Sequence, residues 1–193
     1  MNASVPTDQL RTIAMLAKAN RLDEASVQAA TTFAHYPDDP ILAALAGAIE
    51  FHRRQFERAI TYLYLAHRHH PTDLTVRTNL VEALAQAGRT AEALQLCEAA
   101  VVLADPSLRL ARLAGHLALG AEAFEQAIAF YHHILARDGE DWRTWNNLGN
   151  ALSGAGNPVA ASEALQKAVY LAPDSAPIRL NLGGALIEAE RFA

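Results

Sequence analysis

Histidine is the residue type in this chain whose spacing could hold a metal. His67 and His70 lie one helical turn apart just before Pro71, and His132 and His133 form a second cluster. Two imidazoles at that spacing can bind zinc. No cysteine or carboxylate completes a ligand set close by, and histidine at the end of a helix also interacts favourably with the negative end of the helix dipole. We therefore interpret both clusters as capping and surface residues, and we predict no metal and no cofactor.

The usual signatures of an active site are also missing. Cys97 is the one cysteine, and its place in an apolar stripe predicts a buried, inert thiol. Glycines such as Gly154 and Gly156 lack the strand-glycine-helix context of a phosphate loop. Neither Gly-x-Ser-x-Gly nor His-Glu-x-x-His occurs in the sequence. We therefore predict that this chain is not an enzyme.

Composition limits the remaining classes of function. The chain has 193 residues, is 51% hydrophobic and 19% charged, and has a formal net charge of −5. These values fit a folded protein and argue against disorder. A pI near 5.9 argues against non-specific nucleic-acid binding. The longest charge-free stretch, 144–162, is broken by Asn, Gly and Pro, which predicts no membrane span. A single cysteine fits a reducing compartment, so we expect a cytoplasmic protein.

The elements that must position any site repeat every 34 residues. One column of the alignment holds an alanine in each of five units, at Ala25, Ala59, Ala93, Ala127 and Ala161. The period predicts a tail, 1–5, and then one array with units 6–39, 40–73, 74–107, 108–141, 142–175 and a partial sixth, 176–193.

Each unit predicts two helices of about fourteen residues that pack through small residues. The eighth position holds glycine in four of six units and Ile13 or Val81 in the other two, and the twentieth holds alanine, so that two backbones can approach closely. The fifteenth position should form the tight turn between the helices; it holds Asn20, Arg54, Gly88, Glu122 and Gly156. Because one such pair cannot bury both of its faces, the pairs must stack. The sequence therefore predicts an all-α solenoid.

The segment WNNLGNALSGAGNPVAASEALQKAVYLAPD, 145–174, resembles a tetratricopeptide repeat in its W-x2-L-G, small-residue and Pro positions. The resemblance extends from Pro6 to the end, and it is weakest in unit 6–39. It departs from the family pattern at the eleventh position, which holds Leu, Glu or Ala instead of Tyr. The resemblance implies a right-handed superhelical solenoid of antiparallel helix pairs that binds a protein or peptide partner and performs no catalysis.

In this family the first helix of each unit lines the concave side, which implies a candidate groove. Its residues of interest are Phe51, Asn79, Arg109, Arg112, His116, Arg143, Asn146, Asn147, Asn150 and Asn181. Asn79, Asn147 and Asn181 share the sixth position, where a carboxamide can donate to and accept from an extended peptide backbone. The alternative is that these asparagines are ordinary solvent-exposed residues with no role in binding.

Charge at the groove positions suggests the kind of peptide. Five basic residues stand there, Arg11, Lys18, Arg109, Arg112 and Arg143, against the two acids Glu82 and Glu188. Guanidinium groups suit carboxylates, so we expect an acidic segment. An ordinary solvated helix face would explain the same charges. The basic positions with which some family members clamp a terminal carboxylate are only partly matched, so a clamp of that kind is not predicted.

The last unit stops after its first helix, whose apolar residues Leu182, Leu186 and Ile187 have no second helix to cover them. We therefore expect either a longer protein or self-association through this uncapped repeat. The alternative function that follows is a substrate-recruiting or oligomerising arm of a larger enzyme, such as a glycosyl- or sulfotransferase.

Overall fold

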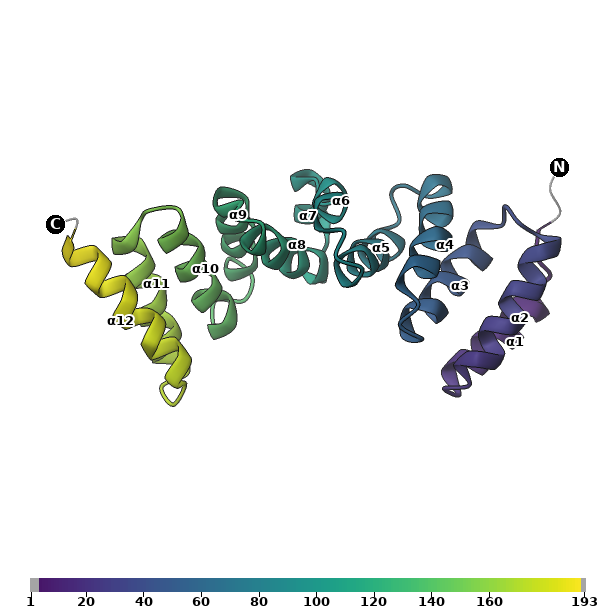
Figure 1. Cartoon of the computed structure of the whole chain (residues 1–193), viewed down its shortest axis with the longest axis horizontal. Helices are drawn as coiled ribbons and strands as arrows, with labels where there is room; N and C mark the ends of the chain where they lie inside the picture. Colours follow the sequence, from purple (N-terminus) through teal and green to yellow (C-terminus); the bar gives the residue numbers. More distant parts are fainter. Residues whose placement is uncertain (1–3, 192–193) are drawn as a thin grey trace. The chain divides into compact units, whose positions relative to one another are not determined.

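The chain folds into antiparallel pairs of α-helices, and the computed structural model describes residues 4–191 (Figure 1). No strand occurs within 4–191. The residues divide into two compact units, an N-terminal unit (Met1–Leu96) and a C-terminal unit (Cys97–Ala193). The N-terminal unit contains α1 (Thr7–Lys18), α2 (Leu22–His35), α3 (Pro40–His52), α4 (Phe56–His69), α5 (Leu74–Gln86) and α6 (Thr90–Gln95). The C-terminal unit contains α7 (Ala99–Ala104), α8 (Arg109–Gly120), α9 (Phe124–Leu135), α10 (Trp142–Gly154), α11 (Pro158–Leu171) and α12 (Ala176–Arg191).

Aspartates start several of the first helices. Asp39, Asp73 and Asp141 each precede a helix and accept hydrogen bonds from two backbone N–H groups of its first turn. These bonds satisfy donors that would otherwise have no intrahelical partner. The three aspartates share the last position of their units, so the same cap recurs with the period of the sequence.

The two helices of a pair approach closely at the small residues, as the sequence predicts. The alanines of the common column, Ala25, Ala59, Ala93, Ala127 and Ala161, are all completely buried. A Cβ at Gly47 would lie 2.6 Å from Leu63 Cγ, and one at Gly149 would lie 2.5 Å from Leu165 Cγ. Both distances are far shorter than van der Waals contact, so only glycine fits at these positions.

The fifteenth position of all five units forms the turn between the helices. Its residues, Asn20, Arg54, Gly88, Glu122 and Gly156, all have φ between 58° and 77°. The left-handed conformation is costly for residues with a Cβ and costs glycine nothing. Three of the five turns therefore carry strain that the two glycine turns avoid.

One expectation is wrong. The second helix of unit 74–107 does not run for about fourteen residues but is divided into α6 and α7, with a break at Leu96–Glu98. Within the N-terminal unit the end of α6 is held by Arg77, whose guanidinium donates to the carbonyl oxygens of Pro71 (2.8 Å) and Leu96 (3.3 Å). The side chain thus satisfies a carbonyl that a continuous helix would bond to its own backbone.

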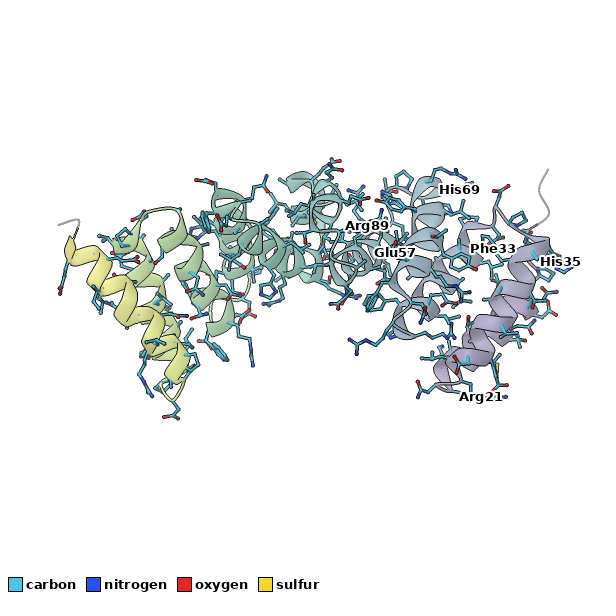
Figure 2. All side chains as sticks on the ribbon, in the orientation of Figure 1. Arg21, Phe33, His35, Glu57, His69 and Arg89 are labelled. Atoms are coloured by element: carbon cyan, nitrogen blue, oxygen red, sulfur yellow. The ribbon has the colours of Figure 1, made fainter. Side chains whose placement is uncertain are left out.

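An ion pair fixes the start of α6 against α4. The Arg89 guanidinium lies 3.0 Å from the Glu57 carboxylate and 2.7 Å from that of Glu92. Arg89 and Glu57 are labelled in Figure 2. Arg89 lies in the turn and Glu57 in the first turn of α4. The pair therefore links successive second helices of the N-terminal unit.

Exchanging residues at the left-handed turns should change stability in opposite directions. We expect Glu122→Gly to raise the free energy of unfolding by about 1 kcal/mol, because glycine removes the strain at this φ. We expect Gly156→Ala to lower it by about the same amount, although an added Cβ there meets no atom within 4 Å. Urea denaturation followed by circular dichroism measures both. A stabilising Gly156→Ala would contradict the explanation.

Candidate functional site

Four polar side chains of the C-terminal unit form a continuous line of hydrogen bonds. Asn181 Nδ2 donates to Asn146 Oδ1 (3.0 Å), Asn146 Nδ2 donates to Asn147 Oδ1 (3.5 Å), and Asn147 Nδ2 donates to His116 Nε2 (2.8 Å). We call these four residues the amide ladder. It extends from α8 through α10 to α12 and joins the first helices of three successive pairs.

The direction of the amide ladder follows from the chemistry of its ends. A carboxamide nitrogen can only donate, so Nε2 of His116 is the acceptor in this arrangement. The three asparagines are half-buried, because α10 packs against both α8 and α12 and holds their side chains between helices. The structure thus brings together four residues that the sequence placed in three different units.

A concavity of about 370 Å³ lies beside the His116 end of the amide ladder. Its lining residues come from α8, α9 and α10: Arg112, His116, Tyr131, Ile134, Trp142, Arg143, Thr144, Asn146 and Asn147. Tyr131 and Ile134 are almost completely buried. We call this concavity the α8–α10 pocket.

Tyr131 is the buried polar residue of the α8–α10 pocket. Its side chain is 1% exposed, and its hydroxyl has no hydrogen-bond partner among the described residues. Burial raises the pKa of the phenol, so the hydroxyl stays protonated at neutral pH. Gly115 makes room for the ring, since a Cβ there would lie 2.7 Å from Tyr131 Cε1. The ring therefore cannot move toward α8 when the pocket is filled.

Arg112 is bound by carboxylates of its own chain. Its guanidinium pairs with Asp141 and, at 3.3 Å, with Asp138, and it donates to Thr144 Oγ1 at 3.3 Å. Burial alone would raise the pKa of Asp141, but hydrogen bonds from Thr144 and Arg112 outweigh it and hold that pKa below the usual range. The positive charge that the sequence offers at this position is therefore compensated internally.

The other two arginines of the predicted groove lie at the surface. Arg109 and Arg143 are both exposed, and the Arg143 guanidinium lies 4.3 Å from the centre of the Trp142 ring. A cation in this position is attracted by the ring face and is held in place without a salt bridge. Arg143 also lines the α8–α10 pocket, so its charge lies at the pocket rim.

The remaining predicted residues are not members of the amide ladder. Asn150 lines a second, shallow concavity that includes Asn181 and Glu188. Phe51 and Asn79 belong to the N-terminal unit and are half-buried there. The Phe51 ring packs against Phe56, with ring centres 5.7 Å apart.

Sequence reasoning missed the base of the site. The sequence suggests that Tyr131 is a packing or outer-surface residue of a second helix, and Asp141 has the signal of a helix cap only. A glycine opposite an aromatic residue, Gly115 opposite Tyr131, could have indicated that the ring reaches the first helix. The pairing of Arg112 with Asp138 and Asp141 has no signal in the sequence, because it depends on the distance between two helix pairs.

The histidines other than His116 lie in the last turn of a helix or directly after it. His35 and His69 end α2 and α4 (Figure 2), and burial together with the nearby Arg77 cation lowers the pKa of His67. Within residues 4–191, no three His, Cys, Asp or Glu side chains lie in a position to hold a metal ion. Over the same range, no helix has the length and apolar character needed to cross a membrane.

Comparison with known proteins identifies the repeats. Two family models, both described as tetratricopeptide repeat, match residues 51–117 and 112–176. YrrB, described as a TPR protein with an unusual peptide-binding site, superposes with a TM-score of 0.81 at 16% identity, over 92% of this chain and 91% of that one. MamA from Desulfovibrio magneticus RS-1 gives 0.70 at 24% identity, over 78% and 85%. No curated protein matches the sequence.

Removing the Arg112 guanidinium should cost stability in a way that depends on pH. A carboxyl group whose pKa is lower in the folded than in the unfolded protein adds stability above about pH 4, and loses that contribution as the pH falls through the folded pKa. We therefore expect Arg112→Met to be less stable than the wild type at pH 7. Because Arg112 is 40% exposed, solvent screening keeps the loss to about 1 kcal/mol or less.

The difference from the wild type should shrink between pH 4 and pH 3, as Asp141 becomes protonated. Urea denaturation at each pH measures it. Arg143→Met, which removes a cation that lies over Trp142, is the matched control and should show a difference that does not change with pH. A loss for Arg112→Met that persists undiminished at pH 3 would contradict the role assigned to the ion pair.

Proposed function

We propose that this chain, which belongs to the tetratricopeptide repeat family, is a protein-interaction module. Its C-terminal unit binds an extended peptide segment along the amide ladder. The observation that carries the proposal is the amide ladder itself, three carboxamides and an imidazole joined across α8, α10 and α12. The fold shared with YrrB, which is described as having a peptide-binding site, supports the same class of ligand.

The amide ladder retains the capacity to bind a peptide backbone. A carboxamide has two N–H donors and an oxygen with two lone pairs. Each asparagine uses one N–H within the ladder, which leaves a second N–H for a ligand. Backbone C=O groups are the complementary acceptors. Because the ladder bonds hold the side chains in single rotamers, less entropy is lost when a ligand binds.

The spacing of the helices suits an extended segment. Packed helix axes lie about 8–10 Å apart, and an extended chain advances about 3.3 Å per residue. Successive first helices would therefore meet about every third residue of the ligand. Contacts to the backbone at such intervals do not depend on ligand sequence, so side-chain preferences must come from the surroundings of the amide ladder.

Arg143 is the source we propose for a preference for acidic peptides. It is exposed, whereas Arg112 is compensated by Asp138 and Asp141. The Arg143 cation lies at the rim of the α8–α10 pocket, close to the amide ladder, where a carboxylate of the ligand can reach it. Surface charges of this kind speed association and add modest, salt-dependent affinity.

Replacing the central asparagines should weaken binding without loss of the fold. Peptides are first selected with the wild-type protein from a displayed library of random twelve-residue segments, and the selected sequence is then synthesised. We expect Asn146→Ala/Asn147→Ala to bind it about tenfold more weakly, because two hydrogen-bonding groups are lost. Fluorescence polarisation of the labelled peptide measures the affinity, and circular dichroism confirms that the melting temperature is nearly unchanged.

The matched control replaces two exposed carboxamides on second helices, Gln126→Ala/Gln166→Ala, and should bind as the wild type does. Equal weakening in both double variants would mean that the amide ladder is not the binding surface. A library from which the wild type selects no peptide would contradict the proposed function as a whole.

The preference for acidic peptides should depend on Arg143. The preference is the ratio of two affinities, that for a selected peptide with Asp and Glu and that for the same peptide with Asn and Gln in their place. We expect Arg143→Gln to reduce this ratio by about threefold to fivefold, and to make the affinity for the acidic peptide less dependent on salt concentration. Polarisation titrations at low and high salt measure both effects. Lys167→Gln is the control, because Lys167 is a cation that also lies over an aromatic ring, Tyr170, but on α11. An unchanged preference in Arg143→Gln would contradict the assignment.

A further inference from the structure

The helix α12 has one packed side and one apolar side that is open to solvent. It packs against α10 and against α11, its neighbour in Figure 1, and Ile178 and Ala185 on the packed side are each 2% exposed. On the opposite side, Leu180 is 77% exposed, Ile187 56% and Leu186 41%. Covering three such side chains would be favourable, because it removes apolar surface from water.

Gly183 lies in the middle of the open side, at the eighth position of its unit. At the same position of two other pairs, a Cβ at Gly47 or Gly149 would lie 2.6 Å or 2.5 Å from a leucine of the second helix. A Cβ at Gly183 would meet no atom within 4 Å. Among the described residues, the place that a second helix takes over the other glycines is therefore open on α12, and a further helix can approach closely there.

The side chains around this glycine form two rows along α12. An α-helix completes two turns in about seven residues and three turns in about eleven. Leu180 and Ile187 are seven residues apart and form one row, which we call the aliphatic row. Arg179, Leu186 and Glu190 form the other row, which we call the charged row. Each row thus has one member near the start of the helix and one nearer its end.

An antiparallel copy of α12 complements both rows. In two helices related by a two-fold axis, each row faces the same row of the partner, with its order reversed. With the axis at Gly183, Leu180 contacts the partner's Ile187. Arg179 lies within about 4.5 Å, measured along the helix, of the partner's Glu190, which its long side chain can span. The two glycines meet at the axis, where they allow the backbones to approach.

The charges favour the antiparallel direction over the parallel one. Arg179 is exposed, and its guanidinium donates to the carbonyl oxygen of Pro173, a neutral group that leaves the positive charge uncompensated. Glu190 is exposed toward the other end of α12. A parallel pair would place each of these residues beside its own copy, which is repulsive, whereas an antiparallel pair forms two ion pairs.

We propose that this chain forms a symmetric dimer through α12, with the two helices antiparallel about a two-fold axis at Gly183. The occupant of the open side is a second copy of the chain, because both rows are complementary to themselves. Such an interface closes at two copies. Since each copy contributes a single helix, the interface is small and the dimer is weak, in exchange with the monomer.

Sedimentation velocity tests the dimer. We expect the mass of the wild type to rise from that of one chain to that of two between about 2 µM and about 200 µM, because association depends on concentration. A chain that remains monomeric at the highest concentration would overturn the proposal. A species that grows beyond two copies would also overturn it, because an isologous contact leaves no second copy of the face exposed.

Ile187→Asp should raise the dissociation constant of the dimer at least about tenfold, because the new carboxylate would lose its hydration in the aliphatic row. Val159→Asp is the matched control: Val159 is also 56% exposed but lies on α11, and this variant should associate as the wild type does. Melting temperatures at low concentration should stay near that of the wild type in both. Equal dissociation constants in the two variants would show that α12 is not the interface.

An exchange of charges tests the antiparallel direction. Glu190→Arg should raise the dissociation constant about fivefold, because it replaces two attractive pairs by two repulsive ones. Adding Arg179→Glu makes both pairs attractive again and should bring the constant to within about twofold of the wild type. Circular dichroism at low concentration checks that the variants keep their helix content. An unchanged constant in Glu190→Arg alone would overturn the arrangement, whatever the double variant does.

Discussion

The close approach of the two helices in each pair is the constraint on which the rest of the structure depends. It requires glycine at Gly47, Gly115 and Gly149 and a completely buried alanine column on the facing helix. Because the facing residues Leu63, Tyr131 and Leu165 fill the space that a Cβ would occupy, the two backbones of each of these pairs are held close together. Side chains on the first helices thereby acquire fixed positions.

A second recurring contact joins consecutive pairs. The side chain at the fourth position donates to the carbonyl oxygen of the turn six residues earlier, from Trp145 Nε1 to Gly139 (2.8 Å) and from Arg179 to Pro173. Arg77 makes the same contact with Pro71 in the N-terminal unit (2.8 Å). In the C-terminal unit these bonds fix the first turns of α10 and α12, which carry Asn146 and Asn181. The amide ladder is thus a consequence of the repeat and not only of its own bonds.

The sequence predicts the features that are set by the residue type at a single position of the repeat. It does not predict those that depend on the distance between one helix pair and the next. The turns at the fifteenth position and the close contacts at the glycines of the eighth position were correctly predicted, because each involves one position with a demanding geometry. The left-handed conformation of the turns is a finding of the structure. The break at Leu96–Glu98 was not, because alanine, leucine and glutamate around it favour helix, and the compensating donor, Arg77, lies nineteen residues away. Arg112 was identified as a groove residue, but its pairing with Asp138 and Asp141 could not be read from the sequence.

Buried polar groups show how the two units differ. Glu50, at the eleventh position where the family has tyrosine, is 2% exposed, but Ser26 and Arg53 hydrogen-bond to its carboxylate and Arg58 pairs with it. Its charge is compensated within the fold, and removing one of these partners would leave a buried carboxylate with less compensation. Tyr131 is buried to the same degree without a partner. An unsatisfied buried hydroxyl costs stability, so burial of the same degree is compensated by partners in the N-terminal unit and is left uncompensated at Tyr131 in the C-terminal unit.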